Sequence, residues 1–165
     1  MVDTSNMILV VAALLIFGIV LTNTLPIIFG NQQSMVRIEQ EAMATSMAEE
    51  IIREMRSKTF NSAMDENSGD GNWPEDFNNI TGSDNTDRDN YSAMDHYHNH
   101  TERYESDQGV WDISIRLCFA QNQHDPEQQC TQTDKTIHKY MTVRVEAENT
   151  DAEVELSALR TLYGE

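Results

Sequence analysis

The chain has 165 residues and a formal net charge of −17, because 28 Asp and Glu stand against 11 Lys and Arg. This imbalance excludes the basic face that nucleic-acid binding requires, and it also excludes adsorption to anionic lipid. Its ordinary consequence is a strongly solvated surface that resists aggregation, as in salty surroundings. Specific cation binding is the alternative.

An unbroken apolar run occupies residues 7–21 (MILVVAALLIFGIVL) near the N-terminus. A membrane-spanning helix needs about 20 apolar residues, and residues 25–29 (LPIIF) extend the run to that length. Pro26 has no backbone N–H and Gly18 has a low helix propensity, so each predicts a soft point. We therefore expect residues 1–33 to form an apolar helix that anchors the chain in a membrane.

The flanks of this run lack the features of a secretory signal. No Lys or Arg precedes Arg37, Asp3 is the only charged side chain ahead of the run, and no A-x-A-like cleavage site follows. Two interpretations stay open. Either a basic leader has been removed and the numbering starts at a mature terminus, or Met1 is the initiator and the segment is an uncleaved anchor.

Residues 34–60 (SMVRIEQEAMATSMAEEIIREMRSKTF) predict an amphipathic helix, because apolar side chains recur at spacings of three and four. The apolar stripe consists of Val36, Ala44, Met47, Ala48, Ile51, Ile52 and Met55. We expect the C-terminal half of this stripe to cover a globular domain. If the helix continues from the apolar run, about 55 residues at 1.5 Å rise would make a rod roughly 80 Å long.

Residues 61–108 are rich in Asn, Asp, Ser and Gly, and they predict a long acidic loop with little regular structure. Loops of this length in compact domains are usually functional, or they are held by ions, sugars or neighbouring residues. We expect Trp73, Phe77 and Ile80 to anchor the loop to the core.

Three N-glycosylation sequons lie in this loop, at Asn79, Asn90 and Asn99. The motif is short, and Asn-rich sequence produces it by chance. Glycosylation at these residues and an undecorated polar loop are therefore both consistent with the sequence.

Two candidate metal-binding sets also occur in the loop. The first set alternates like the oxygen ligands of a calcium loop, although it lacks the turn glycine and the distal Glu of such loops: Asn85, Asp87 and Asp89. The second set would share one face of a strand and could bind a transition metal: His96, His98 and His100. Solvated polar sequence is the simpler interpretation of both sets.

Residues 109–165 predict an antiparallel sheet. Apolar and polar side chains alternate in residues 109–120 and again in residues 137–148, and residues 153–163 supply a third strand. A sheet with one apolar face needs a cover. The stripe of residues 34–60 supplies that cover, so the expected fold class is α+β, with a long N-terminal helix packed on a small sheet.

Two cysteines, Cys118 and Cys130, are spaced like the two ends of a hairpin loop. In an exported domain we expect them to form one disulfide that ties this loop to its strand. Two free thiols would fit a domain that stays in the cytosol. No CxxC motif is present, which argues against a cysteine-based zinc or redox centre.

Two stretches of the sequence are more specific than the order of helices, loop and sheet. One is ATSMAEEIIREMRSKTF at Ala44–Phe60, which is similar to the ATSLAQ-EIIEEIRS-x-PF type of sequence in minor pilins and pseudopilins. The other is the C-terminal MTVRVEAENTDAEVELSALRTLYG. Together with the order of apolar helix, amphipathic helix, loop and sheet, they make the whole chain resemble the type IV pilin and pseudopilin superfamily. Gly18 and Pro26 match the region in which such helices soften on filament assembly.

Two features of that superfamily are missing. The basic leader that ends in Gly or Ala is not present, and the apolar run contains no acidic residue near its start. Asp3 lies outside the run. In this resemblance Asp3 would neutralise the amino terminus of a neighbouring subunit, or its own.

The resemblance implies a pilin-like lollipop that acts as a structural subunit of an extracellular type IV pilus-like filament, and not as an enzyme. The apolar helix would be held in the inner membrane before assembly. It would then pack against the same helix in other copies, with the pilus assembly machinery as a partner and no required cofactor. The residues implied in filament-core packing are Val10, Val11, Leu14, Leu15, Phe17, Ile19, Val20, Leu21, Leu25, Ile27, Ile28 and Phe29.

Three alternatives stay open. The chain could be a minor pilin or a secretion pseudopilin, which would use the same helix. It could instead be a membrane-tethered module whose acidic loop binds calcium or a glycan, and such a module would remain monomeric. An enzyme built on the histidines of residues 96–100 has the least support, because no positioned acid or dry pocket can be argued for it.

Overall fold

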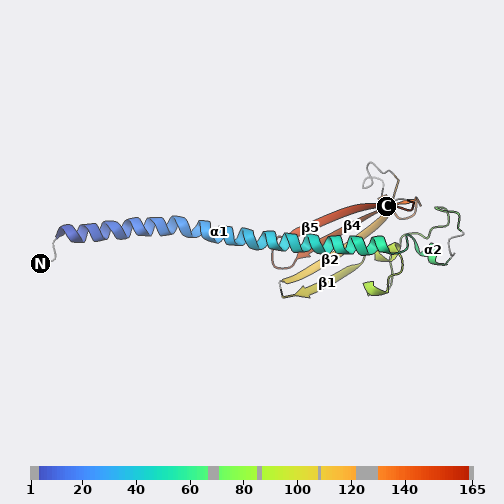
Figure 1. The fold of residues 1–165 in the computed structure, drawn as a ribbon, viewed down its shortest axis with the longest axis horizontal. Coiled ribbons are helices and arrows are strands. Elements are labelled where there is room, and N and C mark those ends of the chain that lie inside the picture. Colours follow the sequence, from blue (N-terminus) through green and yellow to red (C-terminus); the bar gives the residue numbers. More distant parts are fainter. Residues whose placement is uncertain (1–3, 67–70, 85–86, 108, 122–129, 164–165) are drawn as a thin grey trace. The chain divides into compact units, whose positions relative to one another are not determined.

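The computed structural model describes residues 4–66, 71–84, 87–107, 109–121 and 130–163. The chain has an α+β fold with one long helix, α1 (Thr4–Ser57), and a five-stranded antiparallel sheet (Figure 1). Contacts divide it into an N-terminal unit, residues 1–39, and a C-terminal unit, residues 40–165. Helix α1 contributes to both units, and the sheet belongs to the second.

The sheet has the strand order β1-β2-β4-β5, and a short strand β3 pairs with the end of β2. All neighbouring strands are antiparallel. The strands are β1 (Thr101–Ser106), β2 (Gly109–Ala120), β3 (Cys130–Thr131), β4 (His138–Ala147) and β5 (Glu153–Thr161). The predicted strand segments correspond to β2, β4 and β5, which confirms the antiparallel sheet and its α+β class.

The predicted alternation sets which face of the sheet is buried. On β2 the inward side chains are Trp111, Ile113, Ile115 and Leu117, and on β4 they are Met141, Val143 and Val145. Each of these side chains is at most 4% exposed. Successive strand residues point to opposite faces, so the intervening polar residues form the outward face of the sheet.

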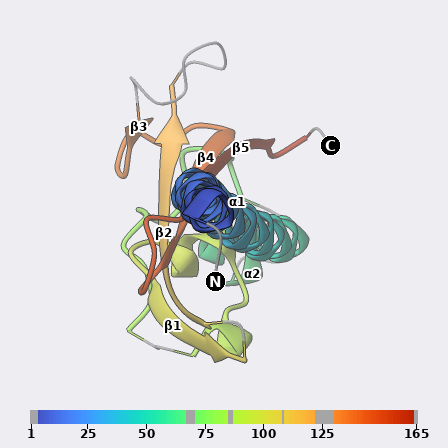
Figure 2. The same cartoon turned by 90° about the vertical axis from the view of Figure 1, so that its left-hand side faces the viewer.

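The C-terminal part of α1 covers the inward face of the sheet (Figure 2). Its buried side chains are Ala44, Ala48, Ile51 and Met55, and Met47 and Ile52 are half-buried beside them. These residues belong to the predicted stripe, and their burial confirms the expected packing. Val36, the first member of the stripe, lies in the N-terminal unit and is 50% exposed.

The expectation of a loop with little regular structure was wrong for part of residues 61–108. The segment contains a short helix α2 (Ser62–Glu66), the 3-10 helices η1 (Arg88–Asn90) and η2 (Met94–Tyr97), and the edge strand β1. Strand β1 has exposed or half-buried side chains throughout, so its sequence has no apolar alternation to reveal it. Hydrogen bonding to β2, and not burial, defines it as a strand.

The three expected anchors of this segment do contact the core cluster. Phe77 and Ile80 are each 1% exposed. Trp73 is half-buried, and its ring stacks on Phe77 with 5.1 Å between the ring centroids. A second ring, that of Phe119 on β2, lies 6.1 Å from Phe77. Apolar and aromatic burial therefore holds this polar segment on the domain.

Cys118 and Cys130 form the expected disulfide, with 5.4 Å between their Cα atoms. The bond joins the end of β2 to β3 and closes a loop with a sequence separation of 12. A disulfide stabilises mainly by restricting the unfolded chain, by about 3 kcal/mol for a loop of this size.

Replacing both cysteines, in the variant Cys118→Ser with Cys130→Ser, should therefore lower the free energy of unfolding by about 2–4 kcal/mol. Denaturant unfolding of the full chain in detergent, followed by near-ultraviolet circular dichroism, measures this change. Treatment of the wild type with a reductant is the matched control and should reproduce the shift. An unchanged midpoint in both experiments would show that the bond does not stabilise the domain.

Candidate functional site: an exposed apolar helix

The N-terminal unit presents one continuous apolar surface on α1. Every large hydrophobic side chain between Met7 and Phe29 is between 41% and 70% exposed. This set includes all the residues expected to pack in a filament core. Monomeric soluble proteins rarely expose contiguous apolar patches larger than a few hundred Å². A patch of this kind is typical of a surface that contacts lipid or another protein.

Within the part of the chain that the structure describes, α1 is the one helix long and apolar enough to cross a membrane. A core helix of a soluble protein and a signal sequence can meet the same criterion, but the apolar window of α1 is not buried at all. Beyond this, no Asp, Glu, Lys or Arg occurs between Met7 and Val36. The segment thus has the composition of a membrane anchor or a signal.

Helix α1 runs without interruption through Gly18 and Pro26. Because Pro26 lacks an N–H, the carbonyl four residues earlier, at Thr22, loses its usual helical donor. The side chains of Thr22, Asn23 and Thr24 donate to the carbonyls of Gly18, Ile19 and Val20, at 2.8, 2.9 and 2.7 Å. Such side-chain bonds satisfy local carbonyls and often bend helices. Softening of this region on assembly stays a prediction.

In the C-terminal unit, an ionic bridge fastens α1 to the long segment that follows it. Arg88 lies between two carboxylates, with Nε 3.3 Å from Oε2 of Glu54 on α1 and Nη1 3.3 Å from Oε1 of Glu102 on β1. The Tyr97 hydroxyl donates to Oε1 of Glu54 at 2.5 Å. Burial, followed by this bond to Glu54, raises the pKa of Tyr97, which keeps its hydroxyl a donor.

The histidines of residues 96–100 do not share one face of a strand. His96 belongs to η2, and its ring lies edge-on to Tyr91 with 5.9 Å between centroids. His100 is held between the Tyr91 hydroxyl, 2.9 Å from Nδ1, and Oε2 of Glu102, 3.1 Å from Nε2. His98 accepts the Leu117 N–H on Nδ1 at 3.2 Å. These rings support loop structure, and among the described residues no three potential ligands gather around a metal site.

The expected calcium and sugar sites remain predictions. Asp87 caps η1 by accepting from the Asp89 N–H at 3.2 Å, and Asn90 donates to its other oxygen at 2.8 Å. Asn85 and Asp3 lie outside the described residues. The three sequon residues Asn79, Asn90 and Asn99 are all exposed, as a sugar acceptor must be.

A buried amine, Lys139 on β4, was not anticipated from the sequence. Its side chain is fully buried, its Nζ donates to the Phe60 carbonyl, and the Phe60 and Phe119 ring centroids lie 4.7 and 5.3 Å away. Desolvation lowers the pKa of Lys139 to about 7, against the opposing effect of the Asp95 carboxylate. Asp95 is itself buried and accepts from the Ser62 N–H at 3.0 Å and the Ser62 hydroxyl at 2.6 Å.

The sequence did contain a signal for this buried lysine. Lys139 has the same parity as Met141 and Val143, which form the inward side of β4. Strict alternation therefore places it on the core side. The charge of a lysine predicts an exposed side chain, whereas the alternation of β4 predicts a buried one, and the side chain is buried.

Comparison of the chain with protein-family models, with curated proteins and with solved structures found no match in any of the three. The long apolar helix, the antiparallel sheet and the disulfide are compatible with a pilin-like fold. The pilin resemblance therefore rests on the sequence pattern and on this compatibility.

The shifted pKa of Lys139 predicts how stability depends on pH. The unfolded lysine holds its proton up to about pH 10.4, whereas the folded one releases it near pH 7. Between these values the unfolded state binds more protons, so the free energy of unfolding should rise with pH, by at most about 1.4 kcal/mol per unit. Lys139→Met should remove this rise.

Denaturant midpoints measured between pH 7 and pH 10 test the prediction. Lys135→Met is the matched control, because Lys135 is only half-buried and its Nζ donates to the Glu75 carbonyl near the surface. The control should retain the pH dependence of the wild type. Parallel curves for the wild type and Lys139→Met would contradict the assignment.

Proposed function

We propose that this chain is a structural subunit of an extracellular type IV pilus-like filament and that it polymerises through the apolar segment of α1. One observation carries the proposal: the large hydrophobic side chains of residues 7–29 are all exposed, and no charge interrupts them. A soluble monomer rarely leaves such a surface in water. A membrane satisfies the segment before assembly, and identical segments of other copies satisfy it afterwards.

On assembly the apolar helix exchanges its contacts with lipid for contacts with neighbouring helices, and this exchange explains why assembly needs specific packing. Burying an apolar side chain away from water contributes about 1.5–3 kcal/mol, but lipid already provides most of that gain. What helix contacts add over lipid is close packing and hydrogen bonding between the helices. The shapes of side chains such as Phe17, Leu14 and Ile28 should therefore matter more for the filament than for membrane insertion.

The polar groups in this segment fit the same scheme. The side chains of Thr22, Asn23 and Thr24 give the Gly18, Ile19 and Val20 carbonyls an additional donor, so these three carbonyls keep a partner in lipid if the helical geometry of this region changes. Asp3 would neutralise an amino terminus in the assembled core. The acidic C-terminal unit would coat the filament and face solvent.

A minor pilin or a secretion pseudopilin would use the same apolar surface and differ in abundance and location. A membrane-tethered module would use that surface only as an anchor and would stay monomeric. Shearing cells, pelleting the released material and imaging it separates these functions. Uniform thin filaments made mainly of this chain are expected, and a chain that stays with the membranes would contradict the proposal.

Phe17→Ala should reduce the sheared filament fraction while the amount of chain in the membrane stays unchanged. Alanine is still accommodated in lipid, but it leaves a gap between packed helices. A loss of about 1.4 kcal/mol per contact would lower assembly tenfold. Tyr163→Ala, which removes an aromatic side chain that is 75% exposed, is the control and should assemble normally. Equal filament yields from both variants would count against core packing by Phe17.

Assembly should also depend on ionic strength, because each subunit carries a formal charge of −17. The screening length falls from about 10 Å at 0.1 M salt to about 3 Å at 1 M. Sheared filaments should therefore sediment intact in molar sodium chloride and dissociate or thin on dialysis to millimolar salt. Sucrose at matched osmolarity controls for water activity. Sedimentation independent of salt would show that the charged units do not repel each other in the filament.

A further inference from the structure

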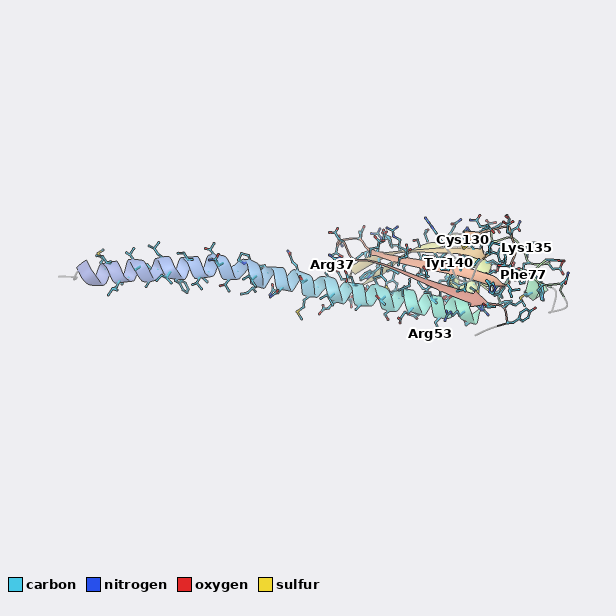
Figure 3. All side chains as sticks on the ribbon, turned by 90° about the horizontal axis from the view of Figure 1, so that it is seen from above. Arg37, Arg53, Phe77, Cys130, Lys135 and Tyr140 are labelled. Carbon is cyan, nitrogen blue, oxygen red and sulfur yellow. A yellow bond between two sulfur atoms is a disulfide. The ribbon has the colours of Figure 1, made fainter. Side chains whose placement is uncertain are left out.

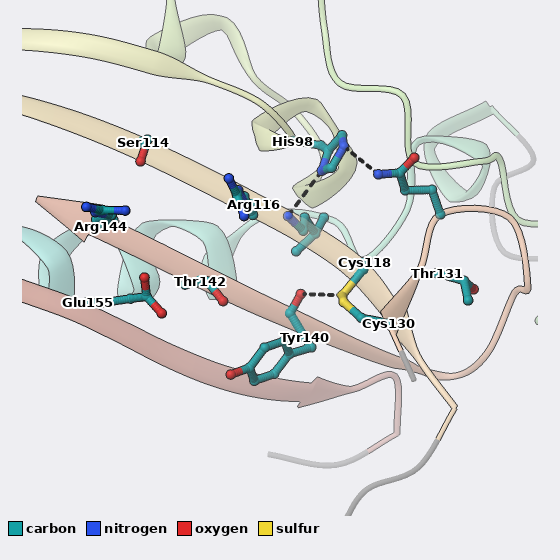
Figure 4. A pocket seen from close by; sticks show the side chains of 12 residues that line it. His98, Ser114, Arg116, Cys118, Cys130, Thr131, Tyr140, Thr142, Arg144 and Glu155 are labelled. Atoms are coloured by element: carbon teal, nitrogen blue, oxygen red, sulfur yellow. Dashed lines mark hydrogen bonds between the residues drawn. A yellow bond between two sulfur atoms is a disulfide. The ribbon is translucent and has the colours of Figure 1, made fainter. Parts of the chain in front are cut away.

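The outward face of the sheet contains an open pocket that the filament proposal does not use. Its volume is about 560 Å³, within the range of about 300–1,000 Å³ that small-molecule sites occupy. Strands β2, β4 and β5 supply most of its side chains, and the disulfide closes one end (Figure 4). The strand residues of the lining used below are Ser114, Arg116, Tyr140, Thr142, Arg144 and Glu155, and His98 and Gln132 line the pocket beside them.

Two cations line this pocket, but their surroundings differ. Arg144 is engaged, because its Nε lies 3.0 Å from Glu153 and its Nη2 pairs with Glu146. Arg116 is exposed, and no carboxylate of the described residues lies within ion-pair distance of it. Other arginines, such as Arg53 on α1, also lack an ion-pair partner among the described residues, but Arg116 lies in this pocket. Its fork of N–H donors matches a carboxylate in two-point geometry.

A second donor lies on the neighbouring wall. The Leu117 N–H donates to Nδ1 of His98, so a neutral His98 ring carries its proton on Nε2. Burial lowers the pKa of His98, which favours this neutral form. The amide nitrogen of Gln132 lies 3.1 Å from Nε2. Two protonated nitrogens cannot bond to each other, so a bond to the neutral ring requires the amide to turn over until its oxygen accepts the Nε2 proton. The NH2 group of Gln132 is then left as a donor for a ligand.

The remaining lining suits a ligand with many hydroxyl groups. Ser114, Thr142 and Tyr140 contribute hydroxyls that donate and accept, and Glu155 contributes an acceptor. The Tyr140 ring adds a flat apolar surface beside them. A single Asp or Glu side chain from another copy would engage Arg116 but would leave this hydroxyl-lined surface unused.

We propose that the outward pocket binds an acidic saccharide, with the sugar carboxylate on Arg116 and the sugar hydroxyls on Gln132, Thr142 and Glu155. The sugar could be free or part of a polysaccharide, since both present the same group. This proposal does not depend on the filament, because the pocket lies wholly within the C-terminal unit.

Isothermal titration calorimetry of the full chain, in a detergent whose head group is not a sugar, tests the proposal. The probe is trigalacturonate, and galactotriose of the same linkage is its uncharged counterpart. We expect trigalacturonate to bind and galactotriose to bind at least about tenfold more weakly, since galactotriose lacks the carboxylate that forms the ionic hydrogen bond with Arg116. A longer polygalacturonate that binds as tightly per site would extend the site to polysaccharide.

Arg116→Gln should lower the affinity for trigalacturonate by about tenfold or more. Arg53→Gln makes the same charge change at an exposed residue of α1 and should leave the affinity unchanged (Figure 3). Thr142→Val should weaken both sugars, because it removes a hydroxyl and no charge. Since all three side chains are exposed or half-buried, the variants should fold, and circular dichroism verifies this.

Three results would overturn the proposal. In the first, Arg116→Gln and the wild type bind trigalacturonate with equal affinity. In the second, acetate binds as tightly as trigalacturonate, which would identify a simple anion site. In the third, no sugar binds and the chain self-associates in a way that Arg116→Gln abolishes, which would make a carboxylate of a second copy the occupant.

Discussion

The packing of the end of α1 on the sheet is the contact on which the C-terminal unit depends. Ala44, Ala48, Ile51 and Met55 are each at most 2% exposed there. Two of these four are alanines, whose small side chains let the helix backbone come close to the sheet. Without this cover, much of the inward face of β2 and β4 would face water, because Phe77, Ile80 and the other core residues of the intervening segment cover only part of it.

The same helix has no such partner in its N-terminal unit. A polypeptide can bury an apolar stripe against its own sheet only where a sheet is present, and the sheet belongs to residues 101–161 of the C-terminal unit. The segment of residues 7–29 therefore stays exposed in the structure. In the proposed function, membrane insertion and polymerisation are two solutions to one physical problem, the solvation of an apolar helix.

Polar groups hold the long segment between helix and sheet in place. Arg88 connects Glu54 on α1 to Glu102 on β1, and His100 connects Glu102 to Tyr91. Paired charges and bonded rings of this kind are costly to break when half-buried, because each partner would be left unsatisfied. Residues that suggested metal binding in the sequence therefore serve as internal supports.

Apolar patterns in the sequence determined most of the fold. The run at residues 7–21, the stripe through Ala44 and Met55, and the alternation in β2 and β4 each specify a burial preference that local geometry converts directly into a helix or a strand. The pairing of Cys118 with Cys130 was expected from their spacing and number for an exported domain, and the structure contains it. These features are local, so the sequence alone contains them.

Only the tertiary structure decided the rest. Strand β1 exists because β2 offers it hydrogen bonds. The rings of His98 and His100 bond to Leu117 and Tyr91, which lie elsewhere in the sequence. Arg116 has no ion-pair partner because no carboxylate of the described residues lies close enough to it. Each of these depends on which groups meet across the fold, and no local pattern encodes such meetings.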